Sequence, residues 1–317
     1  MKFKQSILIL AFALSSVSVL HAQFRGRLQE IGVFMGAANF LGELGGNAKI
    51  GRPFLADMEL SLTRPSMGAF YRYNLNHYTS VRGSLIWGIV QGDDKLVNPR
   101  EFGADEWFRY YRNLSFRSGV VEFSTQVEVN FSRYEPRRKR FRFAPYVFLG
   151  IGGFIFNPKG KINPDPYDPN SKEEWVALQP LGTEGQGTPE YPGSPKYSLL
   201  SWSVPMGFGI KYAVNRYWNL GFELGHRPTD TDYIDDVSTT YPGQDIFFKN
   251  YDPEKAQLAY RLSRRSMEYD NGFGAYSAGT DIHQQRGDPS SFDHYTFMGA
   301  IVVIFNITGG RVICPKF

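Results

Sequence analysis

One stretch of twelve residues, VEFSTQVEVNFS at Val121–Ser132, alternates between apolar and polar side chains along its whole length. A period of two residues is typical of a β-strand with one apolar and one polar face. Strands of globular proteins usually have about five or six residues, whereas a strand that crosses a membrane needs about 9–11. The stretch therefore predicts a membrane-crossing strand of a β-barrel.

Seven further segments have a similar length, which makes eight strands when this one is extended to Gly119–Arg133. The seven are approximately Glu30–Phe40, Pro65–Leu75, Tyr78–Gln91, Arg140–Asn157, Leu199–Asn215, Trp218–Arg227 and His294–Ile307. Their alternation is imperfect, because small barrels also fill part of the lumen with apolar side chains.

The connections between these segments are alternately short and long. The short ones are Asn76–His77, Tyr134–Lys139 and Arg216–Tyr217. The long ones are approximately Leu41–Arg64, Gly92–Ser118, Pro158–Ser198 and Pro228–Asp293. Outer-membrane barrels have short periplasmic turns and long outer loops. We therefore predict an all-β fold, an eight-stranded antiparallel transmembrane β-barrel with both termini in the periplasm.

Charged residues occur in the middle of these strands, among apolar neighbours. They are Arg72, Arg82, Glu122, Glu128, Lys211 and Glu223. Several unpaired charges in the core of a soluble sandwich would be costly, so we expect these six to point into the lumen and pair across it. Side chains fill the interior of an eight-stranded barrel, and we expect no diffusion pore.

Aromatic residues cluster near the expected strand ends. They are Tyr71, Tyr73 and Tyr78 by one short turn, and Tyr212, Tyr217 and Trp218 by another. Such clusters fit the aromatic girdle of a membrane barrel. The alternative is an aromatic core of a β-sandwich, but the alternation of loop lengths favours the girdle.

The first residues have the pattern of a secretory signal peptide, with Lys2 and Lys4 before an apolar run at Ile7–Leu14. This run is too short for a spanning helix. We predict a signal peptide over residues 1–22, cleaved after Ala22, and a barrel domain over residues 23–317. The formal charge of +4 is too small to indicate nucleic-acid binding, and the single cysteine, Cys314, excludes an internal disulfide.

Several polar groupings resemble functional sites, but none has a supporting motif context. LQPLGTEGQG at Leu178–Gly187 lacks the Lys-Ser/Thr ending of a nucleotide-binding loop, so we expect a tight loop over the barrel mouth. A hydrolytic triad could be drawn from His226, His283, His294, Ser290, Ser291, Asp281 and Asp293. We favour ordinary polar residues at the barrel rim and expect no enzymatic activity, because the motif context of a triad is absent.

Two acidic stretches, Asn163–Asn170 and Asp230–Asp236, offer the oxygen ligands that Ca²⁺ prefers. Neither has the spacing of an EF-hand, so we expect solvated acidic loops and predict no metal and no cofactor. The tripeptide RGD at Arg286–Asp288 is weak evidence for adhesion.

Six fragments, taken in order, resemble the PorG family of outer-membrane barrels in the type IX secretion system. They are EIGVFMGAANFLGEL at Glu30–Leu44, RNLSFRS at Arg112–Ser118, YVFLGIGGFIFNPKG at Tyr146–Gly160, LQPLGTEGQG at Leu178–Gly187, WNLGFELGHR at Trp218–Arg227 and TDYIDDVSTTY at Thr231–Tyr241. The resemblance runs from Glu30 to the closing CPKF at Cys314–Phe317. The segment Ile246–Asp288 is rich in charges, and the tail HQQRGDPSS with which it ends matches the family pattern poorly. The resemblance implies a component that tethers a periplasmic ring, built from a PorK-like lipoprotein and a PorN-like protein, to the outer membrane.

The expected periplasmic side carries a basic turn, RYEPRRKRFR at Arg133–Arg142. Its cations could meet anionic lipid headgroups or an acidic face of the ring. The residues expected to contact the ring are Asn76, His77, Arg137, Arg138, Lys139, Arg140, Arg216, Arg311, Lys316 and Phe317. The alternatives are an OmpA-like structural or adhesion barrel that binds ligands through its outer loops, and a lipid-modifying barrel enzyme.

Overall fold

A computed structural model describes residues 28–44, 62–96, 105–162, 172–268, 285–289 and 293–307. Eight antiparallel strands of these ranges form one closed barrel, because β4 pairs with β5 as well as with β3. The barrel strands are β1 (Gln29–Leu41), β2 (Arg64–Asn74), β3 (Thr79–Asp93), β4 (Ser115–Asn130), β5 (Phe143–Ile155), β9 (Met206–Ala213), β10 (Trp218–Pro228) and β11 (His294–Ile307). The predicted fold class is therefore confirmed.

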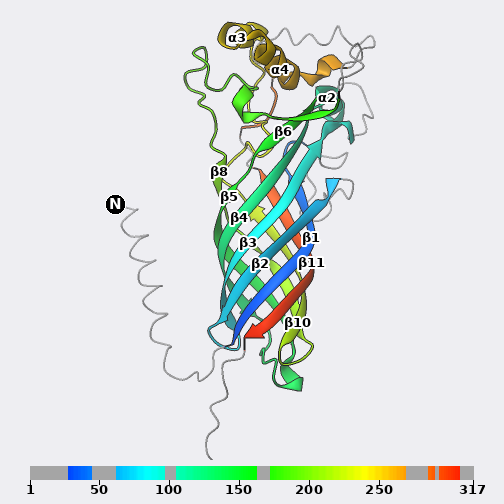
Figure 1. Cartoon of the computed structure of the whole chain (residues 1–317), viewed down its shortest axis with the longest axis vertical. Helices are drawn as coiled ribbons and strands as arrows, with labels where there is room; N and C mark the ends of the chain where they lie inside the picture. Colours follow the sequence, from blue (N-terminus) through cyan, green and yellow to red (C-terminus); the bar gives the residue numbers. More distant parts are fainter. Residues whose placement is uncertain are drawn as a thin grey trace, which may run out of the picture.

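Shorter elements extend the barrel at the end with the long connections (Figure 1). β6 (Pro158–Ile162) pairs with β4, β7 (Glu174–Ala177) pairs with β6, and β8 (Leu200–Ser203) pairs with β5. The helices α2 (Asp105–Arg112), α3 (Gln244–Asn250) and α4 (Pro253–Ser263) lie at this same end. The 3₁₀ turns are η3 (Asp94–Leu96), η4 (Lys139–Phe141), η5 (Gln179–Leu181) and η6 (Arg265–Glu268). Within the described ranges, no helix combines the length and hydrophobicity needed to cross a bilayer.

Two details of the strands differ from the sequence-based expectation. The predicted strand Leu199–Asn215 is broken between β8 and β9, where Pro205 lacks the N–H that a continuous ladder requires. The predicted strand Arg140–Asn157 begins only at Phe143, because Arg140 lies in η4. The short connection before it consequently spans residues 131–142.

The outer surface of the barrel is a band of exposed apolar side chains. On β4, Phe123, Val127 and Val129 are exposed, whereas Glu122 and Glu128 between them are buried. Phe123 and Ile151, on neighbouring strands, have exposed fractions of 64% and 61%. In a soluble protein apolar side chains face the core and charged ones face the solvent. Here apolar side chains form the outer band and charged ones are buried inside, which identifies a transmembrane barrel of the outer-membrane type.

Candidate functional site

The lower lumen, toward the short turns, contains one connected network of buried charges. Arg72 lies 2.8 Å from Glu30 and 2.7 Å from Glu128 (guanidinium nitrogen to carboxylate oxygen). Arg82 lies 3.1 Å from Glu128 and also pairs with Glu223. The Lys211 ammonium lies 3.8 Å from Glu128 and 4.5 Å from the centre of the Tyr134 ring. The structure thus brings together five of the six predicted lumen charges.

The sixth predicted lumen charge, Glu122, belongs to a separate buried cluster higher in the barrel. One of its oxygens lies 3.5 Å from Arg227 and accepts a hydrogen bond of 2.7 Å from the Tyr295 hydroxyl. The sequence analysis did not include Arg227 and Glu30 among the lumen charges. Both lie at positions of their strands whose side chains point into the barrel, so the alternation could have found them. Apolar side chains such as Phe70, Ile86, Phe154 and Phe297 also lie in the core. In the part of the barrel that the structure describes, side chains therefore fill the lumen.

The opposite end of the barrel is closed by a cap, which we define as the segments 42–44, 94–96, 105–114, 178–199, 229–268 and 285–289. LQPLGTEGQG provides its centre. Gly182 and Gly185 have φ angles of 60° and 82°, a left-handed conformation that favours glycine. The tight loop that results buries Glu184, whose carboxylate accepts hydrogen bonds from the backbone N–H groups of Ser238 and Thr239.

Arg286 joins the third long connection to the fourth. Its guanidinium lies 2.9 Å from a Glu184 oxygen and 3.5 Å from an Asp236 oxygen. Asp236 also accepts hydrogen bonds from Thr183 and from the Tyr197 hydroxyl, the latter at 2.6 Å. Arg286 is buried, so the arginine of the RGD tripeptide is not available to a receptor in this arrangement.

Arg112 joins the first two long connections to the same cluster. Its guanidinium pairs with Asp94 at 2.8 Å and donates hydrogen bonds to the carbonyl oxygens of Glu43 and Arg286. Asp235 accepts hydrogen bonds from the N–H groups of Leu44 and Val237. The cap is therefore held by buried polar contacts between all four long connections.

The acidic stretch Asp230–Asp236 is not the solvated loop that the sequence led us to expect. Asp232, Asp235 and Asp236 are buried, and neighbouring connections supply hydrogen-bond donors to two of them, Leu44 to Asp235 and Thr183 and Tyr197 to Asp236. The described residues include no group of three or more His, Cys, Asp or Glu side chains that could hold a metal ion. The other acidic stretch, Asn163–Asn170, lies outside the described residues.

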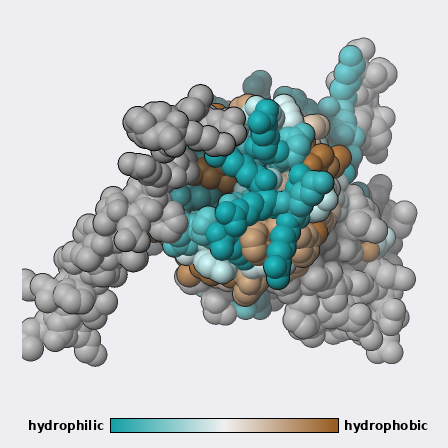
Figure 2. Space-filling view, turned by 90° about the horizontal axis from the view of Figure 1, so that it is seen from below, coloured by the Kyte–Doolittle hydropathy of each residue, from teal (hydrophilic) through white to brown (hydrophobic). Residues whose placement is uncertain are grey.

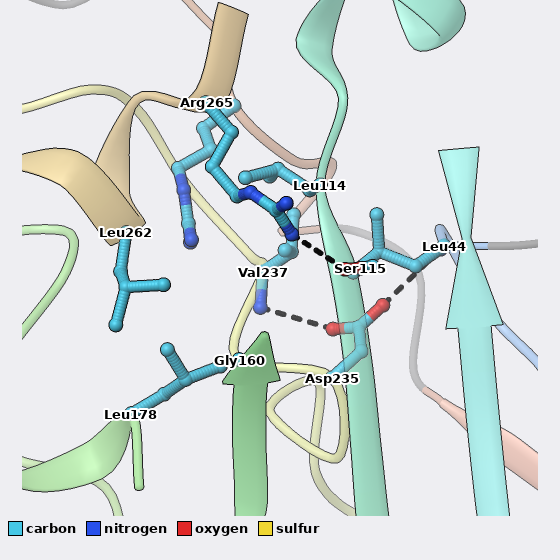
Figure 3. Close-up of a pocket in the computed structure, with 10 residues that line it drawn as sticks. Leu44, Leu114, Ser115, Gly160, Leu178, Asp235, Val237, Leu262 and Arg265 are labelled. Carbon is cyan, nitrogen blue, oxygen red and sulfur yellow. Dashed lines mark hydrogen bonds between the residues drawn. The ribbon is translucent and has the colours of Figure 1, made fainter. Parts of the chain in front are cut away.

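A cavity of about 10 Å³ lies under the cap. Figure 3 shows Asp235 at its floor, with hydrogen bonds to Leu44 and Val237, and Arg265 reaching across it to Ser115. Leu178 and Leu262 complete its apolar side. A space of this size holds at most one water molecule, so this cavity is too small for a substrate.

We expect the cap to lose stability as the pH rises from about 4 to about 7. Burial raises the pKa of Glu43 and that of Asp232 to about 7. Burial also raises the pKa of Asp236 to about 6, although Arg286 acts in the opposite direction. A carboxyl whose pKa is raised by folding binds its proton more tightly in the closed cap than in an opened one. Its stabilising contribution is therefore present at low pH and is lost as the pH rises through the raised pKa.

Hydrogen exchange of the α3 and α4 amides, corrected for the intrinsic rate, measures this effect. Protection should be lower at about pH 8 than at about pH 5, and Asp232→Asn should reduce the difference by removing one of the three titrating carboxyls. Equal protection at both values in the unsubstituted protein would contradict the expectation.

Two of the histidines proposed for a triad lie together at the barrel rim. His226 Nε2 and His294 Nδ1 are 3.1 Å apart, and the planes of the two rings differ by 15°. Asp293 is buried and accepts a hydrogen bond from the Ile234 N–H rather than from either ring. His283, Ser290, Ser291 and Asp281 lie outside the described residues.

The basic turn forms the most exposed part of the opposite end. Arg137, Arg138, Lys139 and Arg140 are all exposed. Glu135, the only carboxylate within Arg133–Arg142, lies 3.2 Å from Arg133 and 3.0 Å from Arg138. Figure 2 views this end and shows hydrophilic residues over its centre, with hydrophobic residues around them.

The other short turns flank this basic turn. The Asn76 side-chain oxygen accepts hydrogen bonds from the N–H groups of Tyr78 and Thr79, which holds the first turn. The carbonyl of His77 accepts a hydrogen bond from the Tyr134 N–H, so the first turn contacts the basic turn. Arg216 is exposed and lies over the Tyr217 ring at 4.6 Å. The remaining predicted contacts, Arg311, Lys316 and Phe317, lie outside the described residues.

Known structures similar to this chain are outer-membrane barrels with very low sequence identity. The attachment invasion locus protein Ail of Yersinia pestis, in complex with a heparin analogue, is 8% identical with a TM-score of 0.35, covering 90% of this chain and 100% of that one. The N-terminal barrel domain of Pseudomonas aeruginosa OprF is 8% identical, with a TM-score of 0.30. The match covers 89% of this chain and 100% of that one. Neisserial surface protein A is 7% identical, with a TM-score of 0.30. The match covers 88% of this chain and 96% of that one. At these scores the fold assignment rests on the strand pairing described above.

The sequence itself gives a family assignment. Comparison with curated proteins found no match. A family model described as a domain of unknown function, DUF6089, matches residues 5–180, which is more than half of the 317 residues. The chain therefore belongs to the DUF6089 family.

Proposed function

We propose that this barrel is a non-enzymatic outer-membrane component of a type IX protein secretion machine. In this role it tethers or positions a periplasmic ring of a PorK-like lipoprotein and a PorN-like protein. The resemblance of six ordered fragments to the PorG family supports the proposal. The filled lumen agrees with an anchoring role, because a barrel without a channel does not conduct a protein cargo.

The observation that carries the proposal is the basic turn. Its exposed cations, Arg137, Arg138, Lys139 and Arg140, occupy the end where β1 begins and β11 ends. The turn is anchored by the buried Tyr134 and by the contacts of Glu135 with Arg133 and Arg138. A cationic surface held in one conformation suits an acidic protein partner, because less side-chain and loop entropy is lost on binding.

The proposal includes an orientation in the membrane. The short turns face the periplasm and the cap faces outward, as in other outer-membrane barrels. Cleavage of the signal peptide after Ala22 then leaves both ends of the mature chain on the periplasmic side, with the basic turn facing the ring.

Charge reversal in the basic turn tests the contact. We expect Arg137→Glu, Arg138→Glu and Lys139→Glu together to lower recovery of the ring proteins about tenfold, because each reversal replaces attraction by repulsion. The measurement is a tagged pull-down from detergent-solubilised outer membranes with quantitative mass spectrometry. The heat-dependent mobility of the barrel on gels reports whether it is assembled.

The double variant Arg117→Glu and Lys159→Glu is the control for charge reversal as such, since it reverses two exposed charges at the opposite end. It should retain the ring proteins. Undiminished recovery with the triple variant would reject the contact. If that variant lost only its affinity for anionic vesicles, the turn would be assigned to lipid headgroups instead.

A second function is favoured by the order of the cap. Phe247 of α3 and Ala259 and Leu262 of α4 form a small core with Leu178 and Leu181. The outer loops thus present a folded surface, on which Phe248 is exposed, and this suits an OmpA-like or adhesion barrel. Loss of surface binding on Phe248→Ser, with the ring contact unchanged, would favour this function.

A further inference from the structure

The sheet continues beyond the membrane on one side of the barrel. The apolar band along β4 begins beside Phe131. A band about 25 Å tall corresponds to about ten residues of a tilted strand, which brings its edge near Val121. Arg117 lies four residues further along β4, about 10 Å beyond the hydrocarbon at the same tilt. This is the outer edge of the lipid headgroup region, which extends up to about 10 Å beyond a 25 Å apolar band.

At this height β4, β6 and β7 form a three-stranded flap. Arg117 of β4 stands directly opposite Lys159 of β6, and Lys161 stands opposite Trp175 of β7. Both Arg117 and Lys159 are exposed. We call the surface formed by Arg117, Lys159, Lys161 and Trp175 the flap face.

The other side of the flap packs against the cap. Val176 and Ile162 contact the small core that contains Leu178 of the third long connection and Leu262 of α4. The flap therefore has one covered apolar side. Because side chains alternate across a strand, the cations of the flap face are directed away from this core.

The charges of the flap face are poorly compensated. Lys161 pairs with Glu173 at 2.7 Å. Neither Arg117 nor Lys159 forms an ion pair with a carboxylate within the described ranges. Like charges directly opposite each other on a sheet are destabilising, whereas an anion between them would relieve the repulsion.

We propose that the flap face binds the phosphate groups of a glycolipid in the outer leaflet. The acyl chains of this lipid lie along the apolar band below, beside Phe123, Ile151 and Ile155, which are all exposed. Arg117 and Lys159 together hold one phosphate group, because a guanidinium offers a planar pair of donors and an ammonium adds a point charge. Trp175 lies at the interface, where its amphipathic ring is favoured. This inference rests on the outward orientation of the cap proposed above, but not on the ring contact.

The test uses the mature chain refolded in detergent and reconstituted into phosphatidylethanolamine nanodiscs that contain diphosphoryl lipid A. Native mass spectrometry after detergent extraction counts the lipid A retained. Arg117→Ala with Lys159→Ala should lower retention on the order of tenfold. Each cation near an anionic membrane surface strengthens lipid binding severalfold, and this variant removes two of them. The single variants should show intermediate losses, and Arg117→Lys should keep most of the retention.

Two controls identify the source of any change. Lys139→Ala with Arg140→Ala removes the same number of exposed cations from the opposite end and should retain lipid A normally. Dephosphorylated lipid A should bind the unsubstituted barrel as weakly as diphosphoryl lipid A binds the double variant. Unchanged retention in a double variant that keeps its folded gel mobility would overturn the proposal. Displacement of lipid A by equimolar inorganic phosphate would also overturn it, because the flap face would then be a site for free anions.

Discussion

Replacing Glu128 with glutamine should lower the free energy of unfolding of the barrel by about 3–5 kcal/mol. Glu128 lies between three cations, 2.7 Å from Arg72, 3.1 Å from Arg82 and 3.8 Å from Lys211. All four side chains are almost fully buried. The lower network contains three cations and the three carboxylates Glu30, Glu128 and Glu223. Glutamine keeps the shape but leaves one buried positive charge uncompensated.

Equilibrium urea unfolding of the barrel refolded into lipid vesicles, followed by tryptophan fluorescence, measures this loss. Glu174→Gln, at the exposed first position of β7, is the matched control and should change stability by less than about 0.5 kcal/mol. Adding Lys211→Met to Glu128→Gln restores charge balance and places an apolar chain against Tyr134 and Tyr146. This double variant should recover at least about half of the loss. A Glu128→Gln barrel as stable as the control would show that the network does not depend on its charge balance.

Replacing Arg286 with alanine should open the cap and leave the barrel intact. The substitution removes the cation that pairs with Glu184 and Asp236, which are both buried. Two carboxylates would then face each other without compensation, at a cost of about 3–5 kcal/mol in the local opening free energy. Exchange of the α3 and α4 amides should accelerate at least about a hundredfold.

The strand amides provide an internal reference for this experiment, because the barrel ladder does not involve Arg286. Arg261→Ala on the exposed face of α4 is the control and should leave exchange unchanged. Arg286→Lys keeps the charge but loses the planar fork of donors, so it should give an intermediate rate. Exchange in Arg286→Ala that matched Arg261→Ala would mean that packing of Phe247 and Leu262, rather than the ion pairs, holds the cap.

The sequence by itself determined the barrel. The number, order and approximate bounds of the strands follow from alternation with a period of two. The placement of short and long connections at opposite ends of the barrel follows from their alternation along the chain. These signals are local. A barrel strand contacts lipid on one face and the lumen on the other, so its own residues alternate between apolar and polar side chains. For this reason the alternation alone is enough to assign Glu122 and Glu128 to the lumen.

Only the tertiary structure decided which charges meet and how the long connections fold. Arg82 pairs with Glu223, 141 residues away, and Arg112 reaches the carbonyl of Arg286, 174 residues away. No periodicity within either segment specifies such a partner. The acidic stretch Asp230–Asp236 looks solvated by composition, yet Asp232, Asp235 and Asp236 are buried. Asp236 meets Thr183 and Tyr197 of the third connection and Arg286, which lies 50 residues further along its own connection. Burial in the cap depends on contacts between segments distant in sequence, which local patterns do not contain.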